Sequence, residues 1–342
     1  MKKLNYKKLG LTSIKVSEIG FGGAGIGHAW GKTDDRECIK CINEAIDNGI
    51  NFFDTSPVYG NGKSEINLGI GLQGKREKVV IASKVRFDNQ MLLKSMKENL
   101  VASVEESLKR LKTDYIDILQ IHHQIGSARG EYQYRDFPPA FAPQLDHEDC
   151  LDFFQASSDL VSQGKVRFIG LTGWNGDFNT VKKLIETNKF TTIQILYNLL
   201  NQSADGVIGN NFDDINQGYD ADSKDNILQI ADDNKIGVIG IRSHAAGALV
   251  DKLDRKIDKL SVIYRDYKRA HVLKKKLSQV GLNLSEIALI YCLKQPKITT
   301  VVPGIKNMLE LKETLGCLEK LNLSLDELSL ISDWYKELTS YY

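Results

Sequence analysis

The chain has 342 residues, with 45 Lys and Arg against 44 Asp and Glu, which gives a formal net charge of +1. Hydrophobic residues make up 42% and charged residues 26%, which are ordinary proportions for a globular protein. This balance gives no support for a nucleic-acid partner, because binding phosphates needs clustered Lys and Arg. No run of about 18 apolar residues predicts a membrane-spanning helix.

The N-terminal residues and the cysteines indicate the compartment. Residues 1–8 lack the apolar stretch of a signal peptide. The five cysteines are odd in number and scattered, and although Cys38 and Cys41 have C-x-x-C spacing, no second pair completes a zinc site. We therefore expect a cytoplasmic protein whose cysteines are reduced.

The first predicted element is a β-hairpin over residues 4–16, turning at residues 10–13. After it one pattern repeats: a short run rich in β-branched residues, a loop, and a longer segment with helical periodicity. Continuous apolar character, as in Val79-Val80-Ile81-Ala82, is typical of strands buried on both faces of a parallel sheet. The predicted strands cover residues 17–22, 51–54, 78–84, 115–122, 167–172, 191–197, 236–241 and 298–302.

Amphipathic helices are predicted between these strands and after the last one. In residues 91–111 apolar side chains recur every three or four positions, which makes one continuous apolar stripe. Residues 324–338 form an extra helix near the C-terminal end, opened by a capping box of Ser324 and Glu327.

Eight strand–helix units without a dividing linker predict one domain over residues 1–342, a (β/α)8 TIM barrel of the α/β class. The N-terminal hairpin would close the bottom of this barrel, and an open doubly wound sheet is the structural alternative. Three segments are longer than a barrel needs: residues 124–146, 198–223 and 249–282. In barrels, such segments after the carboxyl ends of strands carry the functional site.

Polar residues close three successive predicted strands. Asp54, Lys84 and His122 are the last residues of the second, third and fourth strands, and Tyr59 lies in the loop after Asp54. Each residue alone has an ordinary structural explanation, but the ends of parallel strands meet at one mouth of a barrel. Because His122 and His123 are adjacent on a strand, they point to opposite faces and cannot chelate one metal ion. We predict no metal site.

Together, the four residues suit the protonation of a carbonyl oxygen. A free Tyr has a pKa of about 10, and the ammonium of a neighbouring Lys lowers it by favouring the phenolate. In this interpretation Asp54 keeps Lys84 charged and in place, and His122 orients the substrate or helps the proton to move.

These residues resemble the motifs of the aldo-keto reductase family. The similarity extends over residues 9–318, nearly the whole chain, and the motifs occur in the order that the barrel needs. The matching segments are residues 53–60, 81–84, 114–122, 302–304 and 311–313.

The resemblance implies an NAD(P)H-dependent oxidoreductase that reduces an aldehyde or ketone to an alcohol by hydride transfer. Tyr59 would be the general acid, Asp54 and Lys84 would tune it, and His122 would orient the carbonyl. His122 is preferred to His123 because it directly follows the apolar residue of the strand, as in the family. The partner is a small-molecule carbonyl or alcohol, and the sequence does not indicate an oligomeric state.

The resemblance also implies a cofactor site, in which Thr172 and Gln194 would meet the carboxamide of the nicotinamide. The family commonly has Asn where this chain has Gly173, and often Tyr where it has Arg242, a cation that mildly favours reduction over oxidation. The implied cofactor-binding residues are Gly22, Gly23, Asp54, Thr172, Gln194, Arg242, Ser243, Gly304, Lys306 and Glu313.

The adenine end leads us to expect NADP(H) rather than NAD(H). Lys306 is placed to pair with a 2′-phosphate, whereas Glu310 stands where the family often has a basic residue or Gln and would repel that phosphate.

The substrate and the direction of the reaction stay open at this point. Loops rich in Asn, Asp, Gln, Arg and Tyr suit hydrogen bonding to a sugar-derived carbonyl, although they equally suit contact with water. One alternative is a sugar or alcohol dehydrogenase that works in the oxidative direction. Another is a non-catalytic, cofactor-sensing regulatory subunit, since barrels of this family also serve as accessories to membrane channels.

Overall fold

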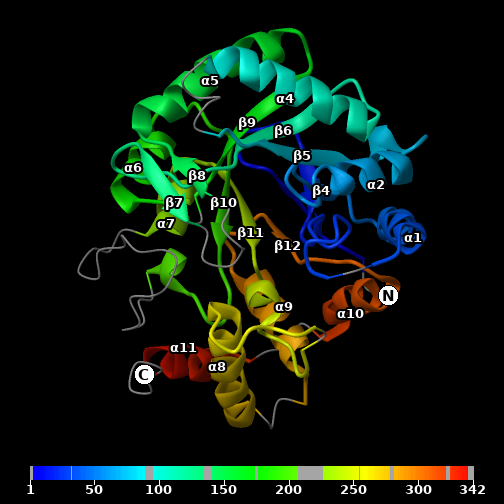
Figure 1. The fold of residues 1–342 in the computed structure, drawn as a ribbon. Helices are drawn as coiled ribbons and strands as arrows, with labels where there is room; N and C mark the ends of the chain where they lie inside the picture. Colours follow the sequence, from blue (N-terminus) through cyan, green and yellow to red (C-terminus); the bar gives the residue numbers. More distant parts are fainter. Residues whose placement is uncertain are drawn as a thin grey trace.

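The computed structural model describes residues 3–31, 33–88, 95–133, 141–173, 176–206, 226–253, 255–277, 281–320 and 324–337. Eight parallel strands form one sheet that curls into a nearly closed barrel, and helices surround it (Figure 1). The strands follow one another in chain order around the barrel. They are β3 (Phe21–Gly22), β4 (Phe52–Asp54), β5 (Val80–Val85), β6 (Ile116–Ile121), β9 (Val166–Thr172), β10 (Thr192–Leu196), β11 (Gly237–Ile241) and β12 (Thr300–Val302).

The first and last strands of this sheet meet through isolated bridges. Ile19 pairs with Val301 and Gly22 with Gly304, and the Gly20 amide donates to the Val301 carbonyl at 2.8 Å. This contact brings the beginning and the end of the chain together and confirms the predicted barrel. All eight strands belong to one sheet, and on that basis we propose that residues 1–342 form one domain.

The predicted N-terminal hairpin is confirmed. Strands β1 (Tyr6–Lys8) and β2 (Lys15–Ser17) are antiparallel, and Leu9, Ile14 and Val16 pack into the lower barrel against residues such as Phe52. Gly10 has φ +57°, and a Cβ there would lie 2.4 Å from the backbone nitrogen of Gly237, so only glycine fits this turn. The hairpin therefore fills the bottom of the barrel with apolar side chains and leaves the opposite mouth for polar groups.

Side-chain caps explain where the helices begin. Asp34, Ser95 and Asp177 accept backbone N–H groups of the first helical turn, and Asp146 and Asn283 form capping boxes. The helices are α1 (Asp35–Asp47), α2 (Lys63–Gly71), α4 (Met96–Leu111), α5 (His147–Ser162), α6 (Phe178–Glu186), α7 (Ile227–Asp233), α8 (Val262–Lys276), α9 (Leu284–Lys294), α10 (Met308–Gly316) and α11 (Leu325–Glu337). Short 3-10 turns cover Arg76–Lys78, Ser203–Asp205, Ala245–Gly247 and Cys317–Lys320. The predicted C-terminal helix is α11, with Ser324 accepting from the Glu327 amide at 3.2 Å.

The structure refines the predicted boundaries. Several strands begin one or two residues later than predicted, and β3 begins four residues later. The long segment 124–146 contains a second antiparallel hairpin, β7 (Gly130–Gln133) and β8 (Phe141–Gln144). The segment 249–282 contains α8, while residues 207–223 of the segment 198–223 lie outside the described residues.

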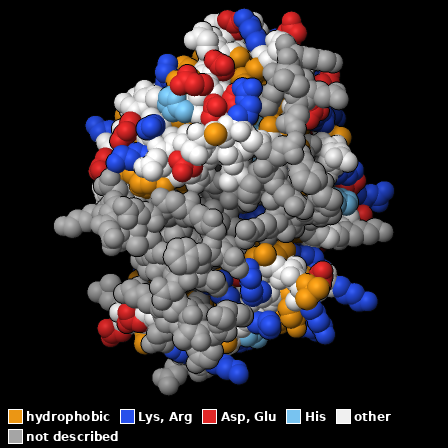
Figure 2. Space-filling model, turned by 60° about the vertical axis from the view of Figure 1, so that its left-hand side comes forward, with side chains coloured by type: hydrophobic (Ala, Val, Ile, Leu, Met, Phe, Trp, Pro, Cys, Tyr) orange, Lys and Arg blue, Asp and Glu red, His pale blue; other side chains and the backbone are white. Residues whose placement is uncertain are grey.

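The surface agrees with the small net charge. On the face shown in Figure 2, acidic and basic side chains are intermixed over the upper half. Of the helices in the described ranges, none combines the length and the apolar character needed to cross a membrane.

Candidate active site

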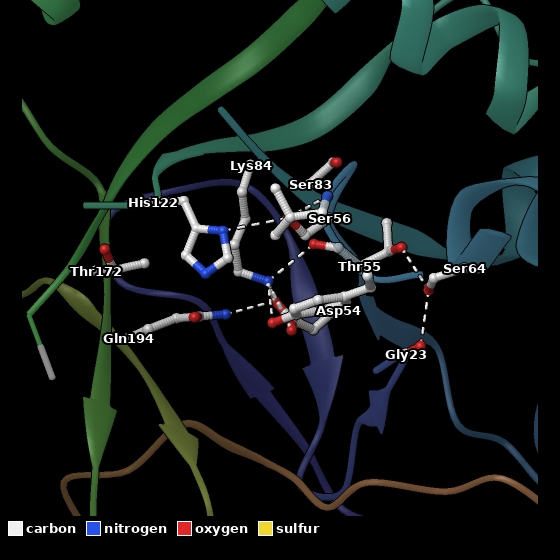
Figure 3. Close-up of polar contacts among 12 residues, drawn as sticks. Gly23, Asp54, Thr55, Ser56, Ser64, Ser83, Lys84, His122, Thr172 and Gln194 are labelled. Atoms are coloured by element: carbon white, nitrogen blue, oxygen red, sulfur yellow. Dashed lines mark hydrogen bonds and ion pairs between the residues drawn. The ribbon is translucent and has the colours of Figure 1, made fainter. Parts of the chain in front are cut away.

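The four residues predicted to act together come from neighbouring elements at the carboxyl ends of the strands. Asp54 ends β4, Lys84 is the next-to-last residue of β5, and His122 directly follows β6. Tyr59 lies in the connection between β4 and α2. Since the strands are parallel, all four side chains gather at the barrel mouth, and Figure 3 shows Asp54, Lys84 and His122 converging there.

Lys84 is the centre of the cluster. Its ammonium donates to both carboxylate oxygens of Asp54 at 2.7 and 2.8 Å, to the carbonyl of Thr55 at 2.8 Å and to the phenolic oxygen of Tyr59 at 3.1 Å. Burial acts to lower the pKa of Lys84, but the charge of Asp54 and its hydrogen bonds outweigh burial, so the pKa lies above its usual value. The ammonium is therefore charged at neutral pH, although its side chain is 0% exposed.

Tyr59 keeps its proton in this environment. Burial raises the pKa of Tyr59, and the charge of Asp54 adds to this effect, whereas Lys84 and Arg242 act to lower it. The net result is a pKa above the usual value, because burial and the charge of Asp54 together outweigh Lys84 and Arg242. Lys84 thus acts in the direction that the sequence predicts, but burial is the larger effect. As Lys84 donates to the phenolic oxygen, the phenol's own hydrogen points elsewhere.

His122 is neutral and lies beside Tyr59. The two ring centroids are 6.0 Å apart with perpendicular planes. Burial, followed by the positive charges of Lys84 and Arg86, lowers the pKa of His122 well below its usual 6.5. Its Nδ1 lies 3.2 Å from the hydroxyl oxygen of Ser56.

His123 faces the other way, as the alternation along a strand predicts. The Phe87 amide donates to its Nε2 at 2.7 Å, and its Nδ1 lies 2.8 Å from the carbonyl of Pro143. Its ring stacks on that of Phe87, with 5.7 Å between the centroids. Its position on the far side of the strand end is consistent with the choice of His122 as the residue at the mouth.

Two further predicted residues line the same mouth. The side-chain amide of Gln194 donates to Asp54 (Figure 3), so Asp54 is held from two sides. The Thr172 hydroxyl donates to the carbonyl of Ile121 and lies 3.2 Å from that of His123. Gln194 and Thr172 are both buried. Since the hydroxyl hydrogen of Thr172 is used within the protein, its oxygen can serve a ligand only as an acceptor.

The predicted glycines have a packing role. A Cβ on Gly22 would lie 2.6 Å from the carbonyl oxygen of Pro303, and one on Gly23 would lie 2.5 Å from that of Asp54. Gly22 therefore permits closure of the barrel, and Gly23 permits the close approach of β3 to β4.

The rim after β11 is held in an uncommon backbone conformation. Arg242 has φ +57°, and its carbonyl accepts from the Asn198 side chain at 2.9 Å. Ser243 is buried, with its hydroxyl 3.2 Å from Nδ1 of His244. Non-glycine residues with positive φ cost energy and occur often at functional sites.

The predicted adenine-end residues lie after β12. Gly304 is exposed, and a Cβ there would reach contact distance of the Trp30 ring. The Lys306 ammonium is 3.2 Å from Glu310 Oε1, while Glu310 Oε2 accepts from the Lys306 backbone amide at 2.9 Å. Glu313 is exposed on α10, one turn beyond Glu310.

Two contacts were missed by sequence reasoning. Ser56 was not among the predicted site residues, although its position between Asp54 and Tyr59 was the available signal. Gln194 was assigned to a ligand only, whereas it also fixes Asp54. In addition, Asn198 and Asn201 belong to one of the Asn-rich loops considered for sugar binding. Their side chains bind neighbouring loop groups, including the amides of Leu200 and Ser203.

Comparisons with known proteins agree with this architecture. The pattern of the Aldo/keto reductase family matches residues 18–336. Aldo-keto reductase YhdN of Bacillus subtilis is 30% identical over 73% of the chain, a match that spans 65% of that relative. L-galactose dehydrogenase of Arabidopsis thaliana is 28% identical over 96% of the chain and 93% of its own length.

Two further comparisons extend this result. The NADH-specific methylglyoxal reductase of Escherichia coli is 32% identical over 59% of the chain and 61% of that protein. Among solved structures, the holo form of aldo-keto reductase AKR11C1 from Bacillus halodurans superposes with a TM-score of 0.70 and 21% identity, covering 97% of this chain and 96% of that one.

Proposed function

The chain belongs to the aldo-keto reductase family of NAD(P)-dependent oxidoreductases, and we propose that it reduces an aldehyde or ketone to an alcohol with Tyr59 as the general acid. One observation carries this proposal. The buried ammonium of Lys84 is held by Asp54 and donates to the phenolic oxygen of Tyr59 at 3.1 Å. The charge that stabilises a phenolate is thus in place before any proton moves.

The residues at the mouth fit a nicotinamide. Thr172 and Gln194 offer an acceptor and an amide beside Asp54, which suits a carboxamide, and the cationic side chain of Arg242 lies on the same rim. The cofactor, when bound, supplies the hydride that reduces the carbonyl carbon. Gly22, Gly23, Ser243, Gly304, Lys306 and Glu313 keep the cofactor-side roles that the family resemblance implies.

The hydrogen-bond directions determine where the Tyr59 proton is directed. Lys84 occupies the phenolic oxygen as a donor, so the Tyr59 O–H is directed to the substrate oxygen. After transfer, the Tyr59 phenolate is stabilised by Lys84, and Asp54 keeps that lysine charged. His122, neutral and beside Tyr59, orients the carbonyl oxygen through its second ring nitrogen.

We propose a small polar carbonyl compound as the substrate, with a sugar-derived carbonyl as the first candidate. Relatives named for L-galactose and for methylglyoxal support this class. Asn198 and Asn201 give it little further support, because both are engaged within their loop. Oxidation of a sugar is the second candidate direction, favoured by the dehydrogenase that matches over 96% of the chain.

The preference between the two cofactors depends on Lys306. The sequence favours NADP(H), and this stays a prediction. Lys306 already pairs with Glu310, so a 2′-phosphate has to compete with a carboxylate for the ammonium. The cytoplasmic location likewise stays a prediction.

The proposal is tested by cofactor oxidation with a panel of aldehydes, ketones and sugars, for wild type and Tyr59→Phe. We expect the variant to lose about 10²- to 10⁴-fold in rate, the range for a general acid, while its cofactor affinity is unchanged. Tyr115→Phe, a tyrosine hydrogen-bonded to Glu77 on the surface, is the matched control. Equal rates for Tyr59→Phe and wild type would overturn the acid assignment. Cofactor binding without turnover of any carbonyl would favour sugar oxidation or a cofactor-sensing role.

A further inference from the structure

Ser56 contacts His122 at Nδ1, the ring nitrogen that is turned away from the barrel mouth. Its hydroxyl oxygen is 3.2 Å from His122 Nδ1, and the residue is 0% exposed. In Figure 3 the other nitrogen of the imidazole points away from Ser56, toward Gln194. The contact therefore fixes which ring nitrogen is turned to the barrel mouth.

The hydrogen bonds of Ser56 decide which atom is the donor. The Val58 amide donates to the Ser56 oxygen at 3.4 Å, so this oxygen already accepts one hydrogen bond. If His122 Nδ1 also donated to it, the buried hydroxyl hydrogen would have no acceptor in this contact, which is costly. If instead the hydroxyl donates to Nδ1, every group in the contact is satisfied. The single proton of a neutral imidazole then sits on Nε2.

We propose that Ser56 is a positioning residue that holds His122 in the tautomer with its proton on Nε2, so that an N–H group faces the substrate oxygen. This inference rests on the proposed function, in which His122 orients the carbonyl. The reverse tautomer would turn a lone pair toward the oxygen and repel it. The strongly lowered pKa of His122 agrees with a neutral ring, in which the tautomer is a real choice.

His123 provides an internal reference, because its hydrogen bonds require the opposite tautomer. The Phe87 amide donates to its Nε2, so the proton of its neutral ring lies on Nδ1 and is donated to the Pro143 carbonyl. Two adjacent histidines are thus expected to hold opposite tautomers, each set by one neighbouring group.

The test reads the tautomers directly in the resting protein. The chain is labelled with ¹⁵N-histidine, and the six histidines are assigned with the help of His122→Asn and His123→Asn. We expect a protonated Nε2 at His122 and a protonated Nδ1 at His123 in wild type. Ser56→Ala should give His122 a mixture of tautomers and leave His123 unchanged, and Ser56→Thr, which keeps the hydroxyl, should restore the wild-type pattern.

The same variants are then assayed for carbonyl reduction. Ser56→Ala should lower kcat about tenfold, less than the ~10²- to 10³-fold cost of removing a transition-state donor outright. Ser83→Ala is the matched control, because Ser83 is also buried but donates to Glu65 at 2.7 Å. It should leave the His122 tautomer as in wild type.

Three outcomes overturn the inference: a protonated Nδ1 at His122 in wild type, an unchanged tautomer in Ser56→Ala, or a changed tautomer with unchanged kcat. Failure of the proposed function is recognised separately, because wild type would then reduce no carbonyl. The ¹⁵N spectra need no substrate and decide the tautomer in that case as well.

Discussion

The two ends of the proposed cofactor site each hold a lysine paired with a carboxylate, and the two pairs differ in burial. The side chains of Lys84 and Asp54 are 0% and 6% exposed, whereas those of Lys306 and Glu310 are 16% and 31% exposed. The first pair has further partners in Thr55, Tyr59 and Gln194. The second pair is an i, i+4 contact that water reaches.

This difference indicates different roles. A buried pair cannot exchange its partner for water without a large cost, so the charge beside Tyr59 stays in one position. A partly exposed pair contributes little to the free energy of unfolding, and an incoming anion can replace its carboxylate. The chemistry is therefore held rigidly at one end, while cofactor choice is adjustable at the other.

Substituting each of the two lysines in turn tests this contrast. This experiment has the largest expected effect on stability. Lys84→Met leaves Asp54 buried without its cation and should lower the free energy of unfolding by about 3–5 kcal/mol. Lys306→Met should lower it by less than about 1 kcal/mol. Urea unfolding measures both values.

A double variant separates charge from packing in this test. Asp54→Asn combined with Lys84→Met removes both charges and should regain part of the loss of Lys84→Met alone. If Lys84→Met and Lys306→Met lower the free energy of unfolding by the same small amount, the Lys84 pair is not the fixed element that its burial indicates.

Stability at acid pH sharpens the comparison, because the titration of Lys84 should not contribute to its pH dependence. The pKa of Lys84 lies above its usual 10.5, so the stabilisation from this lysine is present below that pH and is lost only as the pH rises further. His123 behaves in the opposite sense, since burial lowers its pKa to about 4. Between its usual 6.5 and about 4, the unfolded chain binds a proton that the folded chain excludes.

Stability should therefore fall as the pH falls through this window, by up to ~1.4 kcal/mol per pH unit for each such histidine. His244, whose pKa burial also lowers to about 4, and His122, whose pKa burial lowers well below 6.5, add two further contributions. The free energy of unfolding between pH 7 and pH 4 gives the slope. His123→Gln should reduce it by about a third, and an unaltered slope in this variant would contradict the assignment.

The sequence was sufficient to predict the barrel and the residues that end its strands. Strands buried on both faces leave continuous apolar runs, and a polar residue such as Asp54 or Lys84 stands out where a run ends. The turn of the N-terminal hairpin was visible because Gly10 marks it. The sequence alone could therefore predict that Asp54, Lys84 and His122 share one mouth.

Contacts between side chains on separate elements could not be predicted in the same way. The bonds from Ser56 to His122 and from Gln194 to Asp54 depend on strand register and barrel curvature, which leave no periodic signal. The raised pKa of Tyr59 was missed for a related reason, since both its burial and the opposing charge of Asp54 depend on how the elements pack. By contrast, the spacing of Lys306 and Glu310 in the sequence was a usable signal for an ion pair.

Glu310→Gln tests the partly exposed pair and has the smallest expected effect on stability, less than about 1 kcal/mol. Removal of the carboxylate takes one competing partner from the Lys306 ammonium and removes the repulsion of a 2′-phosphate. We expect the affinity for NADPH to rise about tenfold, equivalent to ~1.4 kcal/mol, with little change for NADH. Titration of cofactor binding by fluorescence measures both affinities without a substrate.

Glu44→Gln makes the same chemical change on the exposed surface of α1, at a residue with no proposed cofactor role. An equal gain in NADPH affinity from this variant would mean that net charge, rather than the Lys306 pair, controls the preference. If Glu310→Gln leaves both affinities unaltered, the 2′-position of the cofactor does not meet Lys306. A gain confined to Glu310→Gln and to NADPH identifies the pair as the point where the choice of cofactor is made, because only that change removes the Glu310 carboxylate from the ammonium.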